Sequence, residues 1–354
     1  MTGTSTITVA FAPETRARRA TRVRRARRAT LAPGDKAGVW RIEHELGRGG
    51  MASVYAVTHA KFGKRAALKL AHRSILGPQF TAETFLREAR IANLVQHRCV
   101  PDVFATGTFD GRPYLVMERL AGRTLGDRLG EGPLGKCAAL EVLLELCDVL
   151  ATAHAAGVVH RDLKLDNVML LEGTIDHRLK LVDWGVAHVI GEADPLSGMV
   201  AGTLTYVAPE QIRGDALTPA ADVYSLAVLA YQVLFGCPPF VARDDLALIK
   251  LHVHEQPPAP TRLCAETPPA LAALLVAMLA KDPARRPALP EVIRVLTAAK
   301  TDFMPPLPRW RDVPSAPPSD AFGRPAIRLT AKGHKVIGTV FAILLAASAL
   351  AGWT

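Results

Sequence analysis

The sequence predicts an α+β fold, and two periodic patterns between residues 46 and 92 support this class. Apolar, strand-like runs continue the glycine-containing segment 46–55 and form residues 66–70. Residues 85–92 repeat apolar side chains at the spacing of one helix face. Further on, residues 160–167 and 183–185 concentrate acids, a lysine and an amide at fixed spacing. A region of strands and a helix therefore precedes a region that carries reactive side chains.

The reactive region has a distinctive order of residues. Residues 160–167 read His-Arg-Asp-Leu-Lys-Leu-Asp-Asn, and residues 183–185 read Asp-Trp-Gly. Phosphoryl transfer needs a carboxylate to orient a hydroxyl, a cation beside the moving phosphate and oxygen ligands for magnesium. The two segments supply this set. On these residues the chain resembles the eukaryotic-like (Hanks-type) protein kinases, and among them the bacterial serine/threonine branch.

This resemblance implies the bilobal protein-kinase fold. A small β-rich N-lobe is expected at about 39–118 and a larger, mostly α-helical C-lobe at about 119–300, within a kinase domain at 33–300. The resemblance also implies that ATP is the phosphate donor. Mg²⁺ is the metal expected with it, and Mn²⁺ is the alternative.

The resemblance assigns the reacting groups as well. Asp162 would orient the substrate hydroxyl and accept its proton, while Lys164 would balance the charge that develops on the γ-phosphate. Asn167 and Asp183 would ligate the magnesium ion. Trp184 stands where the family has phenylalanine, and we expect it to keep a large apolar ring in the core.

The segment 46–55 resembles the glycine-rich loop that covers ATP, although Ala52 takes the place of the third glycine. Lys69 follows on an apolar strand. Its expected partner is Glu88 on the helical segment, with Glu83 as the alternative. The residues expected to contact the nucleotide are Gly47, Arg48, Gly49, Gly50, Val54, Ala67, Lys69, Glu88, Met117 (as the gatekeeper), Glu118, Leu120 and Met169.

Downstream residues complete the family pattern. Residues 202–210 resemble the end of an activation segment, in which Thr203 would line the acceptor site. Asp222 is expected to anchor the backbone of the catalytic loop, and Arg286 is expected to form a buried ion pair with Glu210.

The same comparison suggests where phosphate is added to the chain itself. Ser197 and Thr205 are the candidates in the activation segment, and Arg161 is the expected partner of a phosphate there. Thr21 and Thr30 each follow a pair of arginines, which makes them candidates for autophosphorylation.

The expected activity is transfer of the γ-phosphate of ATP to Ser and Thr of protein substrates, with autophosphorylation. Two alternatives remain open: a pseudokinase-like scaffold that binds nucleotide, and a small-molecule phosphotransferase. The complete reacting set disfavours the first. Ala-Pro-Glu at 208–210 and the distant Arg286 disfavour the second. The sequence leaves the oligomeric state open, a dimer included.

Composition restricts the partners. The formal net charge is +10, of which residues 1–32, with eight arginines and one glutamate, carry +7 and residues 301–335 carry +3. The catalytic region is therefore near neutral, and a specific nucleic-acid-binding domain is not indicated. The five cysteines form no C-x-x-C pair, so we expect reduced thiols rather than disulfides or zinc ligands.

The two ends have their own character. Residues 1–32 predict a basic disordered arm, and residues 301–335 a Pro-rich linker. Residues 336–353 are uncharged and mostly apolar, and as a helix they would extend about 27 Å, close to the thickness of a bilayer core. They predict a single transmembrane helix in the cytoplasmic membrane. The preceding basic residues place the kinase domain in the cytoplasm. A helix packed on the protein is the alternative.

Overall fold

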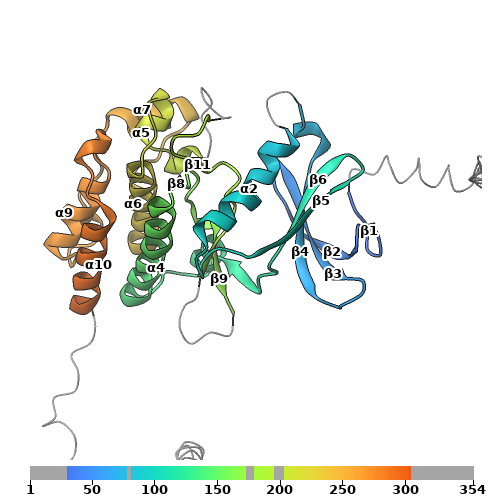
Figure 1. Ribbon diagram of the computed structural model, residues 1–354. Coiled ribbons are helices and arrows are strands. Elements are labelled where there is room, and N and C mark those ends of the chain that lie inside the picture. The colour runs from blue at the N-terminus through green and yellow to red at the C-terminus, as the bar shows by residue number, and fades with distance from the viewer. Residues whose placement is uncertain (1–29, 78–80, 173–178, 195–202, 304–354) are drawn as a thin grey trace, which may run out of the picture. The chain divides into compact units, whose positions relative to one another are not determined.

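A computed structural model describes residues 30–77, 81–172, 179–194 and 203–303 (Figure 1). These residues belong to one compact unit, which ends at Phe303.

Several predictions from the sequence lie outside the described residues. They concern the basic arm as far as residue 29, Ser197, the Pro-rich linker from 304 onward and the transmembrane helix at 336–353. In the described ranges, no helix combines the length and the apolar character that a membrane crossing requires.

The N-lobe is built on one antiparallel sheet of six strands in the order β1-β2-β3-β4-β6-β5. The strands are β1 (Lys36–Ala37), β2 (Trp40–Arg48), β3 (Ala52–His59), β4 (Arg65–Ala71), β5 (Val103–Phe109) and β6 (Arg112–Met117). In the central strand β4, Lys69 pairs in register with Val54 of β3 and Leu115 of β6. This register fixes the position along β4 from which the side chain of Lys69 extends.

Helix α2 (Ala82–Val95) packs against β5 and β6 and also contacts the C-lobe helix α4 (Lys136–Ala155) (Figure 1). The side chain of Thr81 caps its first turn by accepting a hydrogen bond from the Thr84 amide at 3.2 Å. Its buried face follows the helical period, and Glu88 lies on it among apolar residues, whereas Glu83 is exposed. The fold therefore turns an acid toward the interior.

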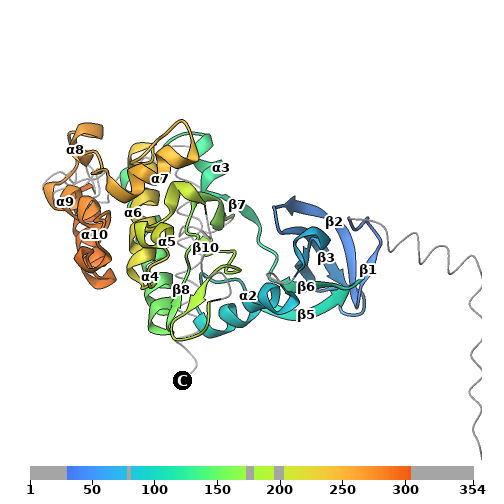
Figure 2. The same ribbon diagram turned by 90° about the horizontal axis from the view of Figure 1, so that it is seen from above.

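The C-lobe is mostly helical, and the helices far from the N-lobe sheet are α8 (Pro260–Leu263), α9 (Pro269–Met278) and α10 (Leu289–Phe303) (Figure 2). Its central helix is α6 (Ala220–Phe235), which is buried along almost its whole length. The other helices in the described part of this lobe are α3 (Leu125–Gly130), α5 (Pro209–Arg213) and α7 (Asp245–His254), together with α4.

Short elements of the C-lobe carry the reactive segments. Two small antiparallel sheets, β10-β9-β7 and β11-β8, flank these segments. In the described ranges, four single-turn 3-10 helices interrupt the loops of the two lobes. The bounds are β7 (Gly122–Thr124), β8 (Val158–Val159), β9 (Val168–Leu171), β10 (Leu179–Leu181), β11 (His188–Val189), η1 (Arg73–Ile75), η2 (Leu165–Asn167), η3 (Leu204–Tyr206) and η4 (Pro283–Arg285).

Each lobe has its own hydrophobic core, which confirms the predicted division into a β-rich and a helical lobe. Ile91 and Val95 of α2 belong to the C-lobe core, so this helix joins the two lobes. Trp184 is buried in the same core, and its indole N–H donates to the Leu181 carbonyl at 3.0 Å. The tryptophan thus keeps the apolar role that we expected and gains a hydrogen bond. The five cysteines, all within the described ranges, are free thiols.

Candidate active site

A cavity of about 490 Å³ opens between the two lobes. Most of the predicted site residues line it: Gly49, Gly50, Val54, Lys69, Glu88, Met117, Asp162, Lys164, Asn167 and Asp183. The chain therefore brings residues from β3, β4, α2, β6, η2 and the loop after β10 around one space.

The other predicted nucleotide contacts lie outside this lining. Ala67 is buried opposite Met117 in the β4–β6 pair, and Met169 lies on β9. Glu118 turns its carboxylate to Lys180, at 2.7 Å. The lining also excludes Gly47, Arg48 and Leu120.

The cavity is also lined by residues that the sequence analysis did not identify. Val182 and Val186 flank the Asp-Trp-Gly segment, so their position in the chain could have indicated them. Ala92, Pro101 and Val103 offered no such signal, because they reach the cavity only through the packing of α2 and β5.

Lys69 holds two carboxylates at once. Its Nζ donates to Glu88 Oε2 at 2.6 Å and to Asp183 Oδ1 at 2.7 Å. Burial alone would lower the pKa of Lys69, but the two carboxylates raise it above its ordinary value. Burial likewise opposes ionisation of Asp183, yet Lys69 holds the pKa of that carboxyl below its usual range. The ammonium and the Asp183 carboxylate are therefore charged at neutral pH. The structure selects Glu88 over Glu83 as the partner of the lysine.

The catalytic loop is held by a buried acid. Asp222 accepts hydrogen bonds from the His160 amide at 2.8 Å and from the Arg161 amide at 2.9 Å, as predicted. Burial works against its charge, but the hydrogen bond from His154 holds the pKa of Asp222 below its ordinary value. The anchor is needed because Arg161 has a positive φ of 70°, a conformation that costs a non-glycine residue about 1–2 kcal/mol.

Around Asp162 the polar atoms form one network. Lys164 Nζ donates to Asp162 Oδ2 at 2.7 Å and to Thr203 Oγ1 at 3.0 Å. The Thr203 amide donates to Asp162 Oδ1 at 2.9 Å. The carboxylate thus has a fixed orientation, and Thr203 lies beside it, where the sequence had placed the wall of the acceptor site.

Asn167 shows whether a divalent metal fits. Its amide nitrogen donates to the Asp162 carbonyl oxygen at 2.8 Å, which leaves Oδ1 as the ligand atom. With the Asp183 carboxylate, the site offers two kinds of oxygen ligand. In the described part of the chain, no cluster of three His, Cys, Asp or Glu side chains could hold a metal alone. Such a sparse oxygen set suits a Mg²⁺ ion that takes its other ligands from phosphates and water.

The glycine-rich segment is fastened at its tip. The amide of His72 donates to the Met51 carbonyl at 2.8 Å. The His72 ring lies 3.2 Å from the Gly50 carbonyl oxygen through Nδ1 and 2.9 Å from Ser53 Oγ through Nε2. This histidine, which no motif indicated, therefore joins the end of β4 to the loop over the cavity.

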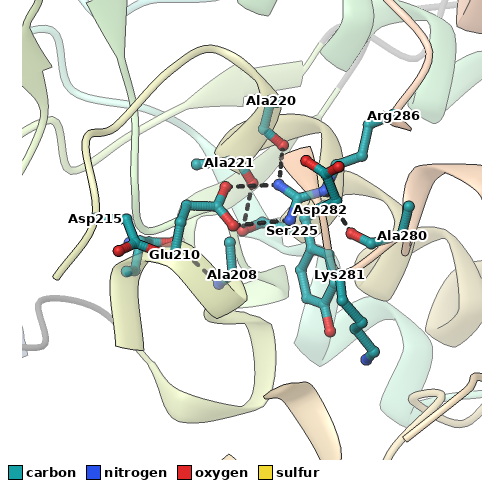
Figure 3. A network of polar contacts seen from close by, with 12 residues as sticks. Ala208, Glu210, Asp215, Ala220, Ala221, Ser225, Ala280, Lys281, Asp282 and Arg286 are labelled. Carbon is teal, nitrogen blue, oxygen red and sulfur yellow. Dashed lines mark hydrogen bonds and ion pairs between the residues drawn. The ribbon is translucent and has the colours of Figure 1, made fainter. Parts of the chain in front are cut away.

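A buried ion pair joins Arg286 and Glu210 in the C-lobe (Figure 3). Arg286 donates to both oxygens of Glu210, at 2.6 and 2.7 Å, and the two side chains are 0% and 1% exposed. The same guanidinium donates to the carbonyls of Ala220 and Ala280, each at 2.8 Å. This pair was predicted from the sequence, and it ties the end of the activation segment to α6 and to the loop before η4.

Comparison with known proteins agrees with this geometry. The sequence model of the protein kinase domain matches residues 40–296. The chain is 37% identical over 256 residues to the serine/threonine-protein kinase Pkn1 of Myxococcus xanthus, which covers 72% of this chain and 37% of that protein. It is 33% identical over 249 residues to the serine/threonine-protein kinase PknB of Mycolicibacterium smegmatis, which covers 68% of this chain and 39% of that protein. The chain thus spans less than half the length of these relatives, and the predicted resemblance to bacterial serine/threonine kinases is confirmed.

Proposed function

The chain belongs to the protein kinase domain family, and from this premise we propose that it transfers the γ-phosphate of ATP to Ser and Thr hydroxyls of proteins. The observation that carries the proposal is the double ion pair of Lys69 with Glu88 and Asp183, which sets the phosphate-binding lysine beside the metal-binding acid. The relatives named serine/threonine-protein kinases support the same activity.

The residues divide the chemistry as follows. Bound ATP supplies the phosphoryl group, and Mg²⁺ neutralises its charge. Lys69 holds phosphate oxygens from the N-lobe side. Asp162 orients the acceptor hydroxyl and accepts its proton, and Lys164, 2.7 Å from that carboxylate, balances charge on the moving phosphate.

Serine and threonine are the proposed acceptors rather than tyrosine. The support lies in Lys164 and Thr203, which contact each other at 3.0 Å beside Asp162. This pattern of a lysine two residues after the acid, with a threonine opposite, is the one on which the sequence resembles serine/threonine kinases.

The metal and nucleotide ligands are also part of the proposal. Asn167 Oδ1 and the Asp183 carboxylate would hold Mg²⁺, with Mn²⁺ as a substitute that accepts the same oxygen ligands. The adenine would lie against Val54 and Met117, both of which line the cavity. The remaining nucleotide contacts that we propose are Gly47, Arg48, Ala67, Glu118, Leu120 and Met169.

We also propose that residues 336–353 anchor the protein in the cytoplasmic membrane, with the kinase domain on the cytoplasmic side. The support is the uncharged apolar run and its basic flank, Lys332 to Lys335. Deletion of 336–354 should move the protein from the membrane pellet to the soluble fraction with its catalysis intact. A deletion variant that still pellets would assign the attachment to the arginine-rich arm.

A transfer assay with γ-labelled ATP and a generic basic protein tests the activity. Label on the protein acceptor, lost in the Asp162→Asn variant, supports the proposal. Nucleotide binding without transfer would instead indicate a scaffold. Transfer to a small molecule but to no protein would indicate a small-molecule phosphotransferase.

A further inference from the structure

The activation segment extends from Asp183 to Glu210, and two of its acids contact arginines of two other elements. Asp194 receives two hydrogen bonds from Arg161, Nη1 to Oδ1 at 3.1 Å and Nη2 to Oδ2 at 2.6 Å. The Arg161 side chain is 3% exposed and that of Asp194 is 22% exposed. This is the bidentate geometry in which a guanidinium and a carboxylate interact most strongly.

Glu192 makes the second contact, with helix α2. Its two carboxylate oxygens accept hydrogen bonds from Arg90, one of them at 3.1 Å. Arg87 lies one turn earlier, with Nη2 3.7 Å from the same carboxylate. The hydrogen bond from Arg90 outweighs burial and holds the pKa of Glu192 below its ordinary value, so the acid is charged.

These contacts lead directly to the reacting groups. Arg161 precedes Asp162 in the chain and has the strained backbone described above. Arg87 and Arg90 flank Glu88, the partner of Lys69. The activation segment is thus tied at once to the loop that carries the base and to the helix that sets the lysine.

In a kinase that is switched on by loop phosphorylation, a phosphoryl group makes this kind of connection. It brings about −1.5 to −2 charges and pairs with arginines, which orders the segment and positions the helix. Glu192 and Asp194 bring two carboxylates to the same sort of partners. Arg161, which the sequence marked as the phosphate partner, already has a carboxylate on both of its terminal nitrogens.

We propose that Glu192 and Asp194 are positioning residues whose carboxylates take the place of a phosphate of the activation segment in its contacts with arginines. The reacting groups then align without phosphorylation of this segment. This inference rests on the proposed kinase activity. It also changes what is expected of Ser197 and Thr205, since phosphate on either becomes unnecessary for activity.

The test compares initial rates of the full-length protein in two phosphorylation states. The first is the protein after autophosphorylation, and the second is the Ser197→Ala, Thr205→Ala variant after phosphatase treatment, with mass spectrometry to verify the state. The two rates should agree within about twofold. A rate that falls tenfold or more without loop phosphate would overturn the inference.

Variants of the acids supply the second arm. Asp194→Asn should lower kcat roughly 10- to 100-fold with little change in KM for ATP, because Asp162 is misplaced while the nucleotide site is intact. Asp194→Glu should recover most of the rate. Glu192→Gln should lower kcat less, since Arg90 is 59% exposed. Asp215→Asn, which removes an exposed ion pair with Arg213, is the matched control and should have no effect.

The outcomes separate the two proposals. If the wild-type protein transfers phosphate and Asp194→Asn retains its full kcat, the positioning role is wrong and the kinase activity stands. If the wild type transfers no phosphate in either state, the proposed kinase activity is wrong, and the inference that rests on it is overturned with it. Should Asp194→Asn not fold, as judged by circular dichroism and binding of a fluorescent ATP analogue, the comparison of Glu192→Gln with the control decides.

Discussion

The buried pair of Glu210 and Arg286 allows a quantitative prediction. Glu210→Gln keeps the shape of the side chain but removes its charge, which leaves the guanidinium of Arg286 without a counterion in a fully buried site. Loss of one partner of a buried pair costs about 3–5 kcal/mol. The replacement of one carboxylate oxygen by an amide nitrogen should therefore strongly destabilise the C-lobe.

The expected thermal shift follows from the size of the domain. At about 2.1 cal/mol/K per residue and about 270 residues, the unfolding entropy is roughly 0.6 kcal/mol/K. A loss of about 3–5 kcal/mol then lowers Tm by about 5–9 °C. Arg286→Met should cost more, because the carbonyls of Ala220 and Ala280 lose a donor as well.

A double-mutant cycle measured by thermal and urea unfolding tests this reasoning. The combined variant Glu210→Gln, Arg286→Met should be less destabilised than the sum of the single variants by at least about 1 kcal/mol. Glu291→Gln, which breaks an exposed pair with Arg294, is the control and should leave the stability close to that of the wild type. Additive effects in the cycle would show that the pair is not energetically coupled, and the argument from burial would be wrong.

Three further predictions concern the site and its surroundings. Lys69→Met and Asp183→Asn should each lower phosphate transfer at least about 100-fold while circular dichroism stays native, because each removes a phosphate or metal contact of the proposed site. His72→Ala should raise KM for ATP about fivefold with kcat nearly unchanged, because the loop over the cavity loses its side-chain hydrogen bonds. Burial and the nearby Lys281 lower the pKa of His252 to about 4, so wild-type stability should fall as pH drops from 6.5 to 4, and His252→Asn should lose that part of the pH dependence.

Each of these has a result that would contradict it. Wild-type turnover in either Lys69→Met or Asp183→Asn removes the assigned nucleotide site. An equal rise in KM for His72→Ala and for the exposed control His44→Ala would show that the His72 contacts are not specific. For His252, the sign follows from its low folded pKa: the unfolded chain binds the proton first. The difference in the free energy of unfolding between the wild type and His252→Asn must therefore become smaller as the pH falls from 6.5 to 4, by up to about 3 kcal/mol. A difference that stays constant over this pH range would refute the role of His252.

The parts of the fold that the sequence predicted are those in which local pattern and chemistry coincide. The period of α2 marked its apolar face, and the resemblance to the kinases selected Glu88 on this helix as the partner of Lys69. Lys69 itself lies on a strand whose alternation was visible in the sequence. The anchor Asp222 was assigned through the same resemblance, and the structure shows it buried inside an otherwise apolar helix.

The parts that escaped prediction depend on contacts between segments distant in sequence. His72 meets the glycine-rich loop because β3 and β4 pair in one register, and a shift by one residue would turn its ring to the other face of the sheet. The cavity lining by Ala92 and Val103 arises from how α2 lies on β5, which no spacing encodes.

The acids Glu192 and Asp194 show this limit most clearly. In the sequence they are two ordinary charges on a glycine-containing loop, and a solvated surface is the default interpretation of such residues. Their importance depends on partners 102 and 33 residues away. A buried arginine such as Arg161 must find an anion or be costly, so its presence in the catalytic loop predicts that some acid or phosphate will meet it. The sequence can therefore indicate that Arg161 needs an anionic partner, whereas only the fold shows that a carboxylate of the same chain, Asp194, contacts it.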